Sequence, residues 1–150
     1  MPAKILIADD NIVNVELLDA YLSGYDYVIE TAADGAETLE KVASFAPDLI
    51  LLDIMMPKYS GFEVCEKLKS DPQTRNIMIL MVTALSERGD IERACNAGCD
   101  DFLSKPVHKI ELIKRVENML KFRSVTDELE RLQRYIDEME ESSRPPKRER

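Results

Sequence analysis

Residues 49–61, LILLDIMMPKYSG, decide the fold. The first four are apolar without interruption, and Asp53 follows them directly. A short, continuously apolar run is typical of a strand that is covered on both faces, as in a parallel sheet between two layers of helices. The stretch therefore predicts a strand over 49–52 inside such a sheet, with Asp53 at its carboxyl end.

Other short apolar runs alternate with segments of helical spacing along the chain. The runs are Ile5–Ala8, Tyr27–Ile29, Ile77–Val82 and Phe102–Leu103. Val13, Leu17 and Tyr21 illustrate the helical spacing between two of them. Turn signals separate the segments at Asp34-Gly35, Asp71-Pro72 and Ala97-Gly98. Repeated strand–helix units predict an α/β fold with five strands and five helices in about 120 residues.

Polar residues follow four of the five predicted strands. They are Asp9, Asp10, Asp53, Thr83 and Lys105. The carboxyl ends of parallel strands meet at one edge of a sheet, where α/β proteins bind their ligands. A single one of these residues could be a helix cap, as could Asp10 or Asn11 for the first helix and Ser86 for the fourth. Capping does not explain the whole set, so we expect a functional site at this edge.

The residue types in this set indicate phosphoryl transfer. Three neighbouring carboxylates repel one another unless a cation or protons neutralise them. An all-oxygen site without histidine or cysteine suits a hard cation such as Mg²⁺. Lys105 would supply a point charge for a phosphate oxygen, and Thr83 a hydroxyl donor. The sequence has no GxxxxGK[ST] or GxGxxG loop, so we expect Asp53 to receive a phosphoryl group without direct use of ATP.

These motifs resemble those of a known family. Asp9-Asp10, the stretch around Asp53, VTA with Thr83 and SKP with Lys105-Pro106 together resemble the receiver domain of two-component response regulators, over residues 3 to about 122. The resemblance implies a flavodoxin-like, doubly wound, five-stranded parallel sheet of order 2-1-3-4-5 with an extended C-terminal helix. It also implies a regulatory protein, not an enzyme, that takes its phosphoryl group from a histidine kinase or phosphotransfer protein. Residues 122–129 are similar to the continuation of receivers attached to diguanylate cyclases.

The resemblance assigns roles at the site. Asp53 would be the phosphoacceptor, Asp10 and Asp53 would bind Mg²⁺ through their carboxylates, and Asp9 would act mainly through water. The backbone carbonyl of Met55 would complete the metal site. Lys105 would contact the phosphoryl group, and its bond to Pro106 would be cis.

The resemblance also describes a switch. Thr83 would move toward the phosphoryl group, and Phe102 would swing inward behind it; the alternative for Phe102 is an ordinary core aromatic. The face formed by helix 4, strand 5 and helix 5 would then repack. The positions two residues after Asp53 and after Thr83 are Met55 and Leu85, both apolar. Because neither can orient a water, we expect slow loss of the phosphoryl group.

Apolar residues after position 121 repeat with heptad spacing. They are Phe122, Val125, Leu129, Leu132, Ile136 and Met139. We therefore expect a receiver domain over 1–121, a helical connector or dimerisation helix over 122–141, and a disordered basic tail over 142–150. A homodimer would use this helix and the helix 4–strand 5–helix 5 face. The alternative is that the helix folds back on the domain or frays.

Composition excludes several other functions. A net charge of −9 argues against broad nucleic-acid binding, and the first apolar run is too short for a signal peptide or membrane span. The three cysteines form no CxxC pair, so we expect small buried residues in a reduced, cytoplasmic protein.

Two other function classes fit the sequence less well. A haloacid-dehalogenase-type phosphatase needs a second Asp where Met55 stands, and an interaction module without phosphate would not need the intact site. No DNA-binding or catalytic segment follows the receiver. The chain could be a stand-alone protein or part of a longer regulator, and residues 122–141 favour the latter.

Overall fold

Five parallel strands form a single sheet in the computed structural model, which describes residues 2–84 and 88–143. They are β1 (Ala3–Ala8), β2 (Tyr27–Ala32), β3 (Leu49–Leu52), β4 (Met78–Thr83) and β5 (Asp101–Ser104). The strand order is β2-β1-β3-β4-β5, and every neighbouring pair is parallel. The predicted doubly wound sheet of order 2-1-3-4-5 is therefore confirmed.

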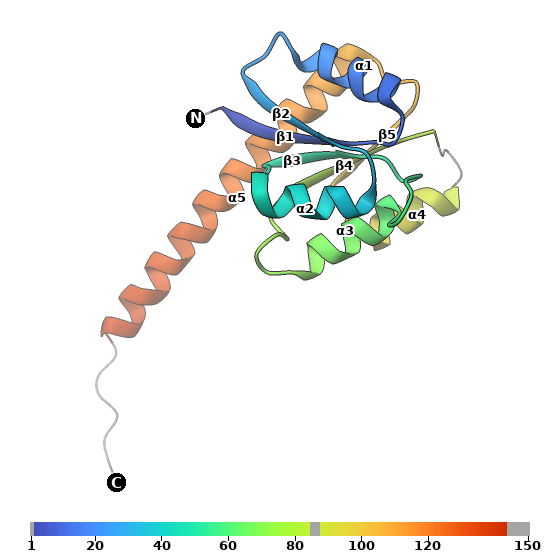
Figure 1. Ribbon diagram of the computed structural model, residues 1–150. Helices are drawn as coiled ribbons and strands as arrows, with labels where there is room; N and C mark the ends of the chain where they lie inside the picture. The colour runs from blue at the N-terminus through green and yellow to red at the C-terminus, as the bar shows by residue number, and fades with distance from the viewer. Residues whose placement is uncertain (1, 85–87, 144–150) are drawn as a thin grey trace.

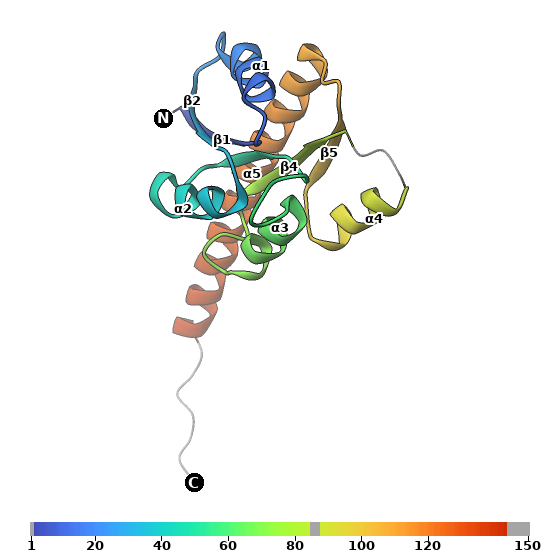
Figure 2. The ribbon, with the colours of Figure 1, turned by 45° about the vertical axis from the view of Figure 1, so that its right-hand side comes forward.

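Helices cover both faces of the sheet. They are α1 (Ile12–Leu22), α2 (Gly35–Phe45), α3 (Gly61–Ser70), α4 (Arg88–Asn96) and α5 (Lys109–Ser143). Helices α1 and α5 lie on one face, and α2, α3 and α4 lie on the other (Figures 1 and 2). Alternate strand residues point to opposite layers, so Ile5 and Ile7 pack toward α1 and α5, whereas Leu6 and Ala8 pack toward the other three helices. All of β3 is buried, as its apolar run predicts.

Side-chain caps fix the start of three helices. Asn11 Oδ1 accepts from the Val13 amide at 3.0 Å, Asp34 Oδ1 accepts from Glu37 at 2.8 Å, and Ser60 Oγ accepts from Glu63 at 3.3 Å. Since Asn11 is the cap of α1, capping does not account for Asp10. The proposed cap at Ser86 lies outside the described residues.

Two details of packing differ from the sequence-based expectation. The spacing of Val13, Leu17 and Tyr21 correctly indicates α1, but the residues that α1 buries are Leu18 and Leu22. Val13 and Leu17 are 68% and 42% exposed. The expectation that all cysteines are buried is wrong for Cys95, which is exposed because this segment packs through Ala94 in α4 and Ala97 directly after it.

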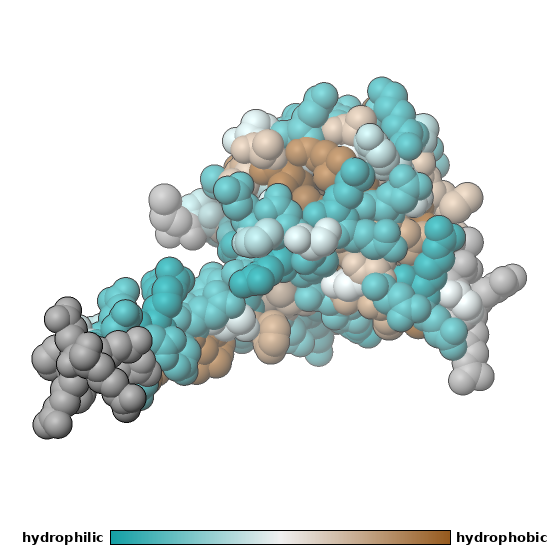
Figure 3. Space-filling model, turned by 90° about the horizontal axis from the view of Figure 1, so that it is seen from below, coloured by the Kyte–Doolittle hydropathy of each residue, from teal (hydrophilic) through white to brown (hydrophobic). Residues whose placement is uncertain are grey.

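Helix α5 is the longest element and confirms the extended C-terminal helix. It runs without interruption for 35 residues, and its last part projects beyond the sheet (Figure 1). We call the exposed apolar side chains of this part the seam: Phe122, Val125, Leu129, Leu132, Ile136 and Met139. Apolar side chains follow one side of the projecting helix (Figure 3).

The functional division of the chain at residue 121 stays a prediction, and positions 144–150 of the expected tail lie outside the described residues. No helix within 2–84 and 88–143 has the length and apolar character that crossing a membrane requires.

Candidate functional site

Strand register brings the predicted site residues together. Ala8 pairs with Leu52 across β1 and β3, so Asp9 and Asp53 are the next residues on adjacent strands. The Asp53 amide donates to the Ala8 carbonyl at 2.9 Å, which holds the two strand ends in line. The site therefore depends on the central strands of the sheet, the most deeply buried part of the fold.

Three carboxylates converge at this edge. Asp9, Asp10 and Asp53 each place one oxygen within 4.8 Å of the others. Asp9 is 4% exposed and Asp53 is 6% exposed, whereas Asp10 is open to solvent. Burial raises the pKa of Asp53, the Asp9 carboxylate raises it further, and Lys105 and the Met55 amide oppose this effect. An oxygen-only cluster with unbalanced negative charge and one open side fits a hard divalent cation such as Mg²⁺.

Lys105 provides the positive charge at the site. Its Nζ lies 3.0 Å from Asp9 Oδ2 and 3.6 Å from Asp53 Oδ2, and its side chain is 20% exposed. The Lys105-Pro106 bond is cis, as the resemblance implies. A lysine between two buried carboxylates is able to contact an anionic group carried by either of them.

The residues of the expected switch lie nearby. Thr83 ends β4, opposite Ser104 in the register with β5, so its backbone is next to that of Lys105. The side chain of Thr83 lies outside the described part of the chain, as does Leu85. Phe102 is half-buried and packs against the core layer of α2, α3 and α4. Its switching role stays a prediction.

Met55 stands at the mouth of the site. Its side chain is 65% exposed, and its amide lies 3.4 Å from Asp53 Oδ1. Its backbone is thus next to the carboxylates, as a metal-binding carbonyl requires.

Two glycines, to which the sequence pattern assigned no role in the site, position the loop after Asp53. A Cβ on Gly61 would lie 2.4 Å from the Asp53 carbonyl oxygen. A Cβ on Gly35 would lie 2.3 Å from the Tyr59 carbonyl oxygen, and the Gly35 amide donates to Pro57 at 3.3 Å. Any larger residue must move this loop. In the sequence, the only sign of this tight loop was the position of Gly61, eight residues after Asp53.

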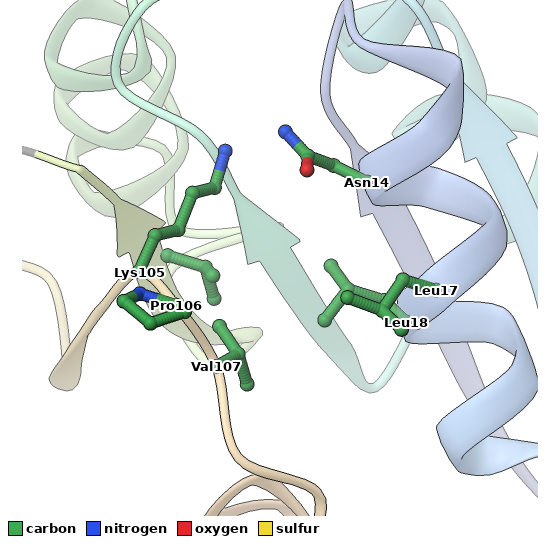
Figure 4. Close-up of a pocket in the computed structure, with 7 residues that line it drawn as sticks. Asn14, Leu17, Leu18, Lys105, Pro106 and Val107 are labelled. Carbon is green, nitrogen blue, oxygen red and sulfur yellow. The ribbon is translucent and has the colours of Figure 1, made fainter.

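An apolar pocket adjoins the charged site. It holds about 400 Å³ between α1 and the loop before α5. Asn14, Leu17 and Leu18 face Lys105, Pro106 and Val107 across it, and Lys105 and Asn14 lie toward the same end (Figure 4). Val13, which is 68% exposed and lies one helical turn before Leu17, extends the apolar surface along α1. An incoming molecule therefore meets an apolar surface beside the acidic cluster.

Comparison with known proteins decides the family. The response regulator receiver domain matches residues 5–117. The chain belongs to this family. A receiver domain accepts a phosphoryl group in two-component signalling, and the motifs quoted from the sequence lie within the matched region.

The individual relatives agree. Response regulator PleD of Caulobacter vibrioides is 46% identical over 129 residues, which are 86% of this chain and 28% of that protein. The polar-differentiation response regulator DivK of Brucella anthropi is 35% identical over 120 residues, 80% of this chain and 98% of that protein. The solved CheY-like receiver domain protein of Methanospirillum hungatei has a TM-score of 0.79 at 27% identity, covering 84% of this chain and 99% of that one.

Proposed function

We propose that Asp53 is the phosphoacceptor of this receiver domain. The observation that carries the proposal is a buried carboxylate, 6% exposed, at the carboxyl edge of the sheet, where Lys105 contacts both it and Asp9. An Asp53 oxygen attacks the phosphorus, the bond from phosphorus to the donor's imidazole nitrogen breaks, and an acyl phosphate forms. The donor is a histidine kinase or phosphotransfer protein.

The other residues of the site neutralise the charge of the phosphoryl group and orient it. Asp10 and Asp53, through their carboxylates, and Met55, through its backbone carbonyl, would hold Mg²⁺, and Asp9 would act mainly through water. When bound, this cation supplies positive charge for the phosphoryl oxygens. Lys105, whose Nζ lies 3.6 Å from Asp53 Oδ2, supplies a second positive charge. Thr83 and Phe102 respond to the new group and repack the face of α4, β5 and α5.

The donor docks on the exposed apolar side of α1. Val13 and Leu17, one helical turn apart on α1, are each more than 40% exposed, and Leu17 lines the pocket that Lys105 also lines. Val13→Ser should slow transfer from a phosphorylated histidine protein and leave labelling by the small donor acetyl phosphate unchanged. An equal loss with both donors would contradict this docking surface.

The output is self-association. Phosphorylation adds about one unit of negative charge and strong acceptor oxygens. Two copies would then meet through the α4–β5–α5 face and the seam of α5. The module is regulatory and has no enzymatic activity of its own. It acts in the cytoplasm without direct contact to nucleic acid or membrane. The net charge of −9 supports the absence of broad nucleic-acid binding.

The phosphoryl group is long-lived. Met55 is 65% exposed at the mouth of the site and offers no hydrogen bond that would orient a water. Leu85 is equally apolar. We expect the acyl phosphate of the isolated protein to have a half-life of minutes or longer. Release of radiolabelled phosphate would measure it. A half-life of seconds would refute the reasoning.

Labelling with acetyl phosphate tests the site. The wild type should take up phosphate only when Mg²⁺ is present, and Asp53→Asn should take up none. Asp19→Asn, which removes an exposed carboxylate from α1, is the matched control and should label normally. Labelling of Asp53→Asn at the wild-type level would overturn the proposal.

A further inference from the structure

The hydrophobic core holds only the first part of α5. Leu112, Val116 and Met119 are at most 6% exposed. Three residues later Phe122 is 64% exposed, and the rest of the seam is between 39% and 60% exposed. Leu120 is the last apolar residue of α5 that packs against the core, so apolar packing does not fix the direction of the helix beyond it.

Beyond the core, polar contacts hold α5 against the domain. Arg123 Nη1 pairs with Asp48 Oδ1, and Arg123 Nε donates to the Asn76 carbonyl oxygen at 3.1 Å. Two turns later, Asn76 Nδ2 donates to Glu130 Oε2 at 3.3 Å. We call these three contacts the latch. They join the extended helix to the segments that precede β3 and β4, at the amino edge of the sheet.

The latch is anchored to a firm part of the fold. The Asp48 amide donates to the Lys4 carbonyl at 2.8 Å, and the Asp48 carbonyl accepts from the Met78 amide at 3.1 Å. Asp48 Oδ2 also accepts from the Lys4 amide at 2.8 Å. Asp48 is thus bonded to β1 and β4 at once, and Arg123 binds the carboxylate oxygen that remains.

Burial identifies the side of the helix that faces the domain. Arg123, Thr126, Asp127 and Glu130 are partly buried, with the spacing of a single helical face. At about 100° per residue, the centre of this face lies about 140° around the helix from the centre of the seam. Over the described residues, the helix does not fold its seam back onto the domain.

The partner that this seam fits is a second copy of the chain. The heptad spacing is self-complementary, since each seam residue meets the same kind of residue on an identical helix. In a parallel pair the flanking positions bring Glu128 next to Gln133 of the second copy. They also bring Tyr135 next to Glu140, so no like charges meet at these positions.

We propose that the latch keeps the seam directed toward a second copy and acts as the pivot through which phosphorylation moves it. This inference rests on the proposed function. Helix α5 begins four residues after Lys105, at the phosphorylation edge, and is held by Arg123 at the opposite edge. The helix extends about 21 Å from Lys109 to Arg123 and about 30 Å from there to its end. Met139, the last residue of the seam, lies about 24 Å beyond Arg123, so a shift of about 1 Å at Lys109 becomes about 1.1 Å there, on the scale of known helix shifts.

Arg123→Gln tests the pivot, with Arg131→Gln as control. Both remove one positive charge, but Arg131 is exposed and its position lies about 90° around the helix from the centre of the domain-facing side. Sedimentation would give the association constant with and without beryllofluoride, a phosphoryl mimic. We expect the mimic to change this constant several-fold in the wild type and the control, and by less than about twofold in Arg123→Gln. Equal responses in all three proteins, or no response in the wild type, would overturn the proposal.

Hydrogen exchange tests the latch without phosphorylation. Amides of residues 122–130 should exchange several-fold faster in Arg123→Gln and in Glu130→Ala than in Arg131→Gln. Unchanged exchange in both variants would contradict the latch. Loss of acetyl phosphate labelling in the wild type would count against the proposed function alone, since this exchange measurement does not depend on Asp53.

Discussion

Replacing Asp53 by Asn should make the metal-free protein more stable, because it removes a charge from a crowded, buried site. The Asp53 carboxylate lies within 4.8 Å of an oxygen of Asp9 and of Asp10, and 3.6 Å from Lys105 Nζ. At an effective dielectric constant of about 20, each repulsion costs about 3.5 kcal/mol and the attraction returns about 4.6 kcal/mol. Solvent screens the exposed Asp10, and Lys105 keeps its contact with Asp9 in the variant. We expect a gain of about 1–2 kcal/mol in the free energy of unfolding.

Urea denaturation in the presence of EDTA would measure this difference. Burial and Asp9 raise the pKa of Asp53, so the cost of its charge is present above the folded-state pKa and disappears as the pH falls through it. The advantage of Asp53→Asn should therefore be largest near neutral pH and shrink toward acid. Mg²⁺ should reduce the difference in the free energy of unfolding between the variant and the wild type, because it stabilises the wild type. A variant that is less stable than the wild type in EDTA at neutral pH would refute this electrostatic account.

Three further predictions concern single residues. Gly61→Ala should lower the free energy of unfolding by about 1–3 kcal/mol and slow labelling, because its Cβ would lie 2.4 Å from the Asp53 carbonyl oxygen; denaturation and acetyl phosphate uptake measure both. Ala46→Gly should stabilise by about 0.5–1 kcal/mol, since Ala46 ends α2 at a φ of 51°, and no gain on denaturation would contradict this. Burial raises the pKa of Cys65 to about 12, so a thiol reagent at pH near 8 should modify exposed Cys95 and spare Cys65 in the native protein, as peptide mapping would reveal.

Much of the fold could be predicted because its signals are local. The uninterrupted run before Asp53 matched β3 residue for residue, and the other strands differ only at their ends. The carboxylate cluster was also accessible, since each member follows a strand and parallel strands end at one edge. The cis bond at Lys105 and the strand order came from the family resemblance, because neither follows from the spacing of apolar residues.

Other features depend on contacts between distant segments. The outward direction of Val13 and Leu17 depends on how α1 rotates against β1, and Leu18 and Leu22 fill the core equally well by spacing. The tight fit of Gly61 against Asp53 depends on the path of a loop. The latch joins Arg123 to Asp48 and could not be read from either segment alone. Charge pairs of this kind have no periodic signature in a sequence.

The most direct test of the account is to locate the phosphoryl group on the chain. After reaction with acetyl phosphate and Mg²⁺, borohydride reduction converts an aspartyl phosphate to homoserine, which mass spectrometry of peptides can assign to a position. The account predicts homoserine at position 53 and nowhere else. Modification at another carboxylate, with Asp53 unchanged, would contradict it.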